Sequence, residues 1–97
     1  MKLDGTEVTL KFGRYGNGRL ALQLFDEDNC PYTTVTVNLV NESVCNSMCT
    51  FIDTNNNGDD IITWLEDNGL GRALGLYGES GFCTYPQFEF NEEVVNI

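Results

Sequence analysis

The sequence predicts an α+β domain, a twisted antiparallel β-sheet of about five short strands with one amphipathic helix on one face. Three observations lead to this class. Apolar and polar residues alternate through the first third of the chain, one later stretch repeats apolar residues at helical spacing, and glycine and asparagine separate the segments. The 97 residues are expected to form a single small domain, because a chain of this length has room for one modest core.

Three N-terminal segments alternate between apolar and polar residues: 6–12, 19–25 and 32–39. A period of two residues is typical of strands with one buried face. Asn17-Gly18 lies between the first two segments and is the strongest short signal for a β-hairpin. A charged turn leads into the third segment, so we expect three consecutive antiparallel strands that form a meander.

Residues 59–68 predict the one helix. Ile61, Trp64 and Leu65 recur at helical spacing, and acidic residues at the start suit the positive end of the helix dipole. Asn68-Gly69 provides the expected C-terminal stop.

Short segments around this helix complete the predicted sheet. A brief strand is expected at residues 51–53, and two more at 73–77 and 87–90, on either side of a glycine-rich turn. Residues 92–97 begin with two glutamates and are expected to form a frayed acidic tail.

The charge is strongly negative and unevenly placed. Fifteen acids face five bases, and four of the bases fall within residues 1–19. Such a surface repels nucleic-acid phosphates and anionic membranes, so neither is an expected partner. It suits a protein with a basic surface, for example a nuclease or a DNA-binding protein. The alternative is that the acidity only keeps the protein soluble.

The chain contains no histidine, which excludes Ser-His-Asp and Cys-His catalysis and the zinc helix with two histidines. The sequence also lacks the apolar segments of a secretory leader or a membrane span. We therefore expect a cytoplasmic protein that is not an enzyme.

Cys30, Cys45, Cys49 and Cys83 are expected to be free thiols in a reducing compartment. Two disulfides or a four-cysteine zinc site are the alternatives. Only the pair Cys45 and Cys49 has the spacing of a zinc knuckle, so zinc is disfavoured.

Asp53, Asn55, Asn57 and Gly58 match the first half of an EF-hand calcium loop, but its twelfth position, where a glutamate belongs, is Trp64. An irregular calcium site is one hypothesis. Its ligands would be Asp53, Asn55, Asn57 and Asp59. The interpretation we prefer is that these side chains form turns and a helix N-cap, which needs no cofactor.

Acids gather around the predicted helix, and a chain this small cannot easily bury eleven aromatic residues. An exposed aromatic side chain rimmed by acids would be a good anchor for a protein partner. The expected partner-binding residues are Asp53, Asp59, Asp60, Glu66, Asp67 and Tyr85.

Several runs of the sequence resemble one known family. They are residues 17–24, 51–56, 66–71 and the run Gly78-Glu79-Ser80-Gly81-Phe82-Cys83-Thr84-Tyr85-Pro86. The chain resembles the bacterial domain of unknown function 4313. This resemblance implies a small acidic protein of mobile genetic elements or phages with no assigned reaction. Genes in that setting often encode inhibitors of host defence, so it further implies a candidate anti-restriction or anti-CRISPR protein.

Overall fold

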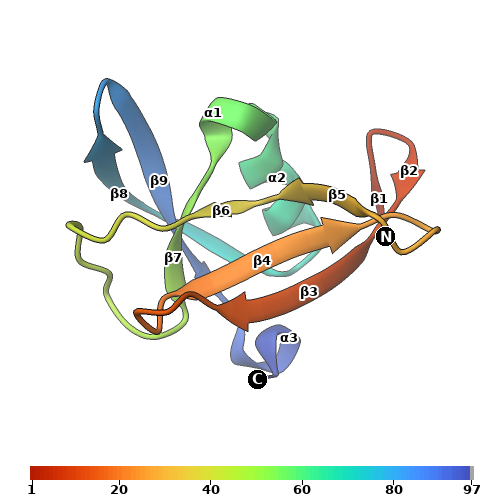
Figure 1. Ribbon diagram of the computed structural model, residues 1–97, viewed down its shortest axis with the longest axis horizontal. Coiled ribbons are helices and arrows are strands. Elements are labelled where there is room, and N and C mark those ends of the chain that lie inside the picture. Colours follow the sequence, from red (N-terminus) through yellow and green to blue (C-terminus); the bar gives the residue numbers. More distant parts are fainter. Residues whose placement is uncertain (97) are drawn as a thin grey trace.

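Antiparallel pairing organises most of the chain. The computed structural model describes residues 1–96, which form nine strands in three sheets and three short helices (Figure 1). The α+β class is confirmed, but the expectation of about five strands and one helix is wrong. The first sheet pairs β1 (Lys2–Leu3) with β2 (Thr6–Glu7). The second contains β3 (Thr9–Arg14), β4 (Leu20–Phe25) and β5 (Pro31–Thr34), in that order. The third has the strand order β6-β7-β9-β8 and contains β6 (Thr36–Val37), β7 (Cys49–Ile52), β8 (Gly71–Ser80) and β9 (Cys83–Phe90).

The predicted meander is present as β3, β4 and β5. The third predicted strand, however, serves two sheets. β5 pairs with β4, and β6 then pairs with β7. Val35 lies between them and is fully buried; its N–H donates to the carbonyl of Leu22, and its own carbonyl accepts from the N–H of Asp53. One residue therefore joins the meander to the four-stranded sheet.

β8 and β9 form a hairpin that is longer than the two short strands expected from the sequence, and it extends from the body of the molecule (Figure 1). Glycines obscured the strand pattern of β8. Two of them are required by packing, because a Cβ at Gly78 would lie 2.7 Å from the ring of Phe51, and a Cβ at Gly71 would collide with the carbonyl oxygen of Glu89. Strand glycines of this kind mark a close approach of neighbouring groups.

The apolar side chains form two clusters, with β7 between them. Ile52 belongs to the larger cluster, with Leu65 of the helix and Phe88 and Phe90 of β9. Phe51 belongs to the smaller cluster, with Leu39 and Tyr85. Successive side chains of a strand point to opposite faces, so all four residues of β7 are buried.

The predicted helix is confirmed as α2 (Asp60–Asp67), which buries Ile61 and Leu65 against the larger cluster. Two further helical turns were not expected, α1 (Thr54–Asn57) and α3 (Glu92–Val95). The prediction of a frayed tail is wrong for residues 92–96, because Val95 is buried in the core; Ile97 lies outside the described residues. No helix among residues 1–96 has the length and apolar character needed to cross a membrane.

Candidate functional site: an acidic groove with aromatic walls

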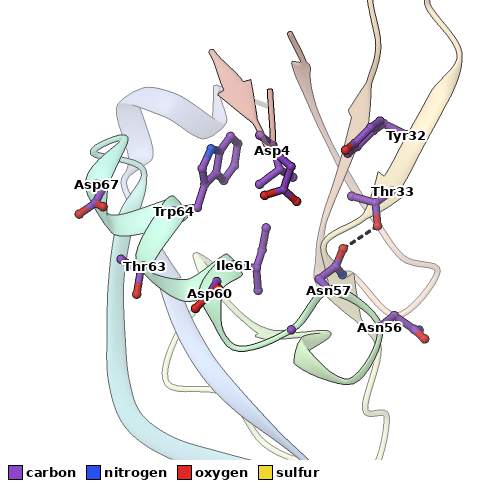
Figure 2. Close-up of a pocket in the computed structure, with 12 residues that line it drawn as sticks. Asp4, Tyr32, Thr33, Asn56, Asn57, Asp60, Ile61, Thr63, Trp64 and Asp67 are labelled. Atoms are coloured by element: carbon purple, nitrogen blue, oxygen red, sulfur yellow. Dashed lines mark hydrogen bonds between the residues drawn. The ribbon is translucent and has the colours of Figure 1, made fainter. Parts of the chain in front are cut away.

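An open groove of about 610 Å³ lies between the β1–β2 turn, β5, α1 and α2 (Figure 2). We call it the acidic groove. Its carboxylates come from Asp4, Asp60 and Asp67, and its apolar and aromatic surface from Leu3, Tyr32, Ile61 and Trp64. Figure 2 shows the carboxylate of Asp4 directed into the space between the wall that carries Trp64 and the wall that carries Tyr32. The groove thus combines negative charge with aromatic rings.

The turn between β1 and β2 places Asp4 in the groove. Leu3 pairs with Thr6, so only Asp4 and Gly5 form the loop, and both have positive φ angles of 51° and 83°. Two-residue hairpin loops favour Asp-Gly because both central positions require such backbone angles. The dipeptide in the sequence was the signal that could have revealed this hairpin, and it was missed.

Trp64 supplies one wall of the groove. Its indole N–H donates to the backbone carbonyl of Lys2, which holds the β1–β2 hairpin against α2. Tyr32 on β5 lines the groove as well, with 39% of its surface exposed. Trp64 is half-buried and also packs against the larger cluster, so it presents only part of its indole to the groove, whereas Tyr32 is more exposed.

Asn57 connects α1 to β5. The hydroxyl of Thr33 donates to Asn57 Oδ1 at 2.7 Å, and Asn57 Nδ2 donates to the carbonyl of Thr34 at 3.0 Å. These bonds fix the side of the groove formed by α1. They also occupy an oxygen that the calcium hypothesis assigns as a ligand.

Asp53 acts as the N-cap of α1. Its Oδ1 accepts from the backbone N–H of Asn56 at 3.1 Å, and its Oδ2 accepts from Asn56 Nδ2 at 2.7 Å. This is the cap-and-turn role that we preferred from the sequence. Within residues 1–96, no group of three or more histidine, cysteine or acidic side chains is placed to hold a metal.

The acids expected to bind a partner divide into two groups. Asp60 and Asp67 line the groove, whereas Asp53, Asp59 and Glu66 do not. Asp59 is exposed at the start of α2. Glu66 accepts from the backbone N–H of Ala73 at 3.0 Å, so it covers part of the open edge of β8.

The expectation of an exposed Tyr85 is wrong. The residue has only 9% of its surface exposed and packs in the smaller cluster, because it lies directly opposite Gly78 on the inner face of the hairpin. A hydrogen bond with the side chain of Cys83 raises the pKa of the Tyr85 hydroxyl. The exposed aromatic residues of this hairpin are instead Tyr77 and Phe82, the latter fully exposed in the turn.

The arginines are engaged within the fold. Arg14 donates to the carbonyls of Gly18 and Ser47, and Arg19 donates to those of Leu39 and Glu42. These contacts hold the long loop before β7. They also leave these two cations less available to neutralise carboxylates elsewhere.

Few carboxylates are paired. Within residues 1–96, Glu89 forms an ion pair with Arg72 at 3.1 Å and Glu7 with the N-terminal amine at 3.3 Å, and no other acid has a cation within 4.0 Å. Hydrogen bonds from Asn46 and Arg72 lower the pKa of Glu89. Thirteen of the fifteen acids therefore present charge without an ion-pair partner in the described part of the chain.

The four cysteines are unpaired in the structure and differ in accessibility. Cys30 and Cys45 are exposed, Cys83 is half-buried and Cys49 is buried. Burial raises the pKa of the Cys49 thiol, which disfavours the reactive thiolate.

Comparison with known protein families identifies the family of this chain. A model of the domain of unknown function DUF4313 matches residues 9–96. The chain belongs to the DUF4313 family. No curated protein and no solved structure was found to match it significantly. The run from Gly78 to Pro86, one of those that carry the resemblance, forms the end of β8, the turn and the start of β9. Within it, Gly78 is required by its packing against Phe51.

Proposed function

We propose that this DUF4313 protein is a non-enzymatic interaction protein that binds a basic site on another protein. The observation that carries the proposal is the set of thirteen unpaired carboxylates on a chain with a net charge of −10. Carboxylates can stand in for phosphates at a surface that normally holds nucleic acid. Complementary charge also steers association and raises its rate.

The acidic groove is the part of this surface best suited to contact. Its lining combines carboxylates with the half-buried Trp64 and the exposed Tyr32, and tryptophan and tyrosine are enriched among the residues that dominate binding energy at interfaces. The other acids, spread over the exterior, would contribute mainly to steering.

The partner class that fits is a nuclease or another DNA-binding protein in the bacterial cytoplasm. Resemblance to proteins of mobile genetic elements favours an inhibitor of host defence, either anti-restriction or anti-CRISPR. Such an inhibitor would occupy the basic site and keep nucleic acid out of it, with no bond made or broken by the inhibitor itself.

Affinity capture from the host lysate, followed by binding measurements with the purified partner, tests the proposal. We expect the affinity to fall about tenfold or more between low and high salt, because exposed charges are screened beyond about 10 Å at 0.1 M ionic strength. Excess DNA should compete for the partner. Salt-independent binding, direct binding of this protein to nucleic acid, or turnover of a substrate would contradict the proposal.

A further inference from the structure

We propose that the acidic groove is a recognition site for an arginine side chain of the partner protein. The guanidinium would sit beside the carboxylate of Asp4, between the walls that carry Trp64 and Tyr32, and Asp60 at the rim of the groove would add negative charge. This inference rests on the proposed function, since it names the group by which the basic partner is recognised. It concerns one site, whereas the proposed function requires only a negative exterior.

The dimensions and charge of the groove suit a cationic side chain. Its volume of about 610 Å³ lies in the range of about 300–1,000 Å³ typical of small-ligand sites. Among the described residues, neither Asp4 nor Asp60 accepts a side-chain hydrogen bond or forms an ion pair. Their oxygens are therefore available to an incoming donor.

The aromatic walls favour arginine over lysine. A guanidinium is planar and weakly hydrated; it stacks on aromatic faces and donates to carboxylates in a bidentate manner. An ammonium is compact and strongly hydrated, so it gains less from the rings of Trp64 and Tyr32. A groove with carboxylates alone would not discriminate between the two cations in this way.

The walls are held in place before any ligand arrives. The indole N–H of Trp64 donates to the carbonyl of Lys2. On the side formed by α1 and β5, Asn57 is bonded to Thr33 (Figure 2) and to Thr34. Pre-organisation of this kind reduces the entropy lost on binding. It makes discrimination by geometry feasible in an open site.

The single tryptophan of the chain is Trp64, so intrinsic fluorescence reports directly on the groove. The probes are three capped glycine-serine peptides with one central residue, which is arginine, lysine or citrulline. Citrulline keeps the shape of arginine without its charge. We expect a saturable change in Trp64 emission with the arginine peptide, about threefold or more weaker binding of the lysine peptide, and no saturable change with citrulline. Equal binding of lysine or citrulline, or an unchanged emission with arginine, would overturn the inference.

Matched variants separate this site from the general charge of the protein. Asp4→Asn keeps the turn, because asparagine also accepts the positive φ of 51°, and it is combined with Asp60→Asn. The control is Glu92→Gln with Glu93→Gln, the same change of charge on α3, which lies away from the groove at the lower end of the view in Figure 1. An NMR amide spectrum checks that each variant is folded.

We expect the groove variant to bind the arginine peptide about tenfold more weakly and the α3 variant to change its affinity less than about twofold. Equal losses in both variants would overturn the groove inference and leave the proposed function standing, because general charge would then suffice. The opposite outcome is also distinguishable. If the arginine peptide binds the groove but partner binding does not depend on salt, the proposed function is contradicted, whereas the arginine site in the groove is supported.

Discussion

The indole N–H of Trp64 donates to the backbone carbonyl of Lys2, 62 residues away in the sequence. This bond ties the β1–β2 hairpin to α2 and so holds Asp4 over the acidic groove. Replacing Trp64 by phenylalanine keeps an aromatic ring but leaves the Lys2 carbonyl without its donor. We expect a loss of about 0.5–1.5 kcal/mol in the free energy of unfolding, measured by urea denaturation.

Amide hydrogen exchange provides the local readout for the same variant. Exchange should become faster at residues 2–7 and remain unchanged in β7, which lies in the centre of the fold. Uniform acceleration across the whole chain would show that the bond has no specific role in holding the hairpin.

Gly78 packs against the ring of Phe51 with no room for a side chain. A Cβ at this position would lie 2.7 Å from Phe51 and 2.9 Å from Leu39. We expect Gly78→Ala to lower the free energy of unfolding by about 1–3 kcal/mol, because a close-packed cluster must shift to admit the methyl group. The matched control is Gly16→Ala, where no atom lies within 4 Å of the added carbon. Equal stability of the two variants would contradict the packing argument.

The buried thiol of Cys49 should react slowly. Burial raises its pKa, whereas Cys30 and Cys45 are exposed. Labelling of the folded protein at neutral pH, followed by mass spectrometry of its fragments, should modify Cys30 and Cys45 first and Cys49 only after unfolding in denaturant. Early modification of Cys49 would mean that β7 opens readily in the folded state.

Glu89 should make stability depend on pH below neutrality. Hydrogen bonds from Asn46 and Arg72 lower its pKa from the ordinary value of 4.5, so the folded state favours the carboxylate. The resulting stabilisation is present above pH 4.5 and is lost as the pH falls through the lowered pKa. Glu89→Gln should therefore lower the Tm at pH 7, with a difference that shrinks as the pH is reduced below 4.5. A constant difference at every pH would contradict the assignment.

Calcium should leave the loop before α2 unchanged. The side-chain oxygens of Asp53 and Asn57 already accept hydrogen bonds within the chain. We expect no change in the amide chemical shifts of residues 53–60 on addition of millimolar calcium, with a magnesium titration as the control for ionic strength. Saturable shifts specific to calcium would restore the ligand-binding hypothesis for Asp53, Asn55, Asn57 and Asp59.

Much of the fold follows from local patterns. Alternation predicted the meander, and helical spacing with an Asn-Gly stop predicted the helix of residues 60–67. Alternation gave the wrong result where one segment of the chain pairs with strands of two different sheets. Residues 32–39 alternate like a single strand, but Val35 bonds to both Leu22 and Asp53, so the segment divides between two sheets. The length of β8 was also missed, because glycines required by close packing resemble turn residues.

The candidate site was predicted only in part. Acids near the helix were expected to meet a partner, and Asp60 and Asp67 do line the groove. Asp4 was not expected there, because it lies in a turn at the other end of the sequence. Tyr85 was expected at the surface, but strand alternation alone does not tell which face of a hairpin packs against a second cluster.

The sequence by itself determined the net charge, the lack of histidine chemistry and the membership in DUF4313, because these properties depend on which residues are present. It also determined the meander and the main helix, since their signals lie within a few neighbouring residues. Only the tertiary structure decided that Asp4, Tyr32 and Trp64 share one groove and that the arginines are occupied within the fold. Both depend on contacts between distant parts of the chain, and no local pattern of residue types specifies which distant residues meet.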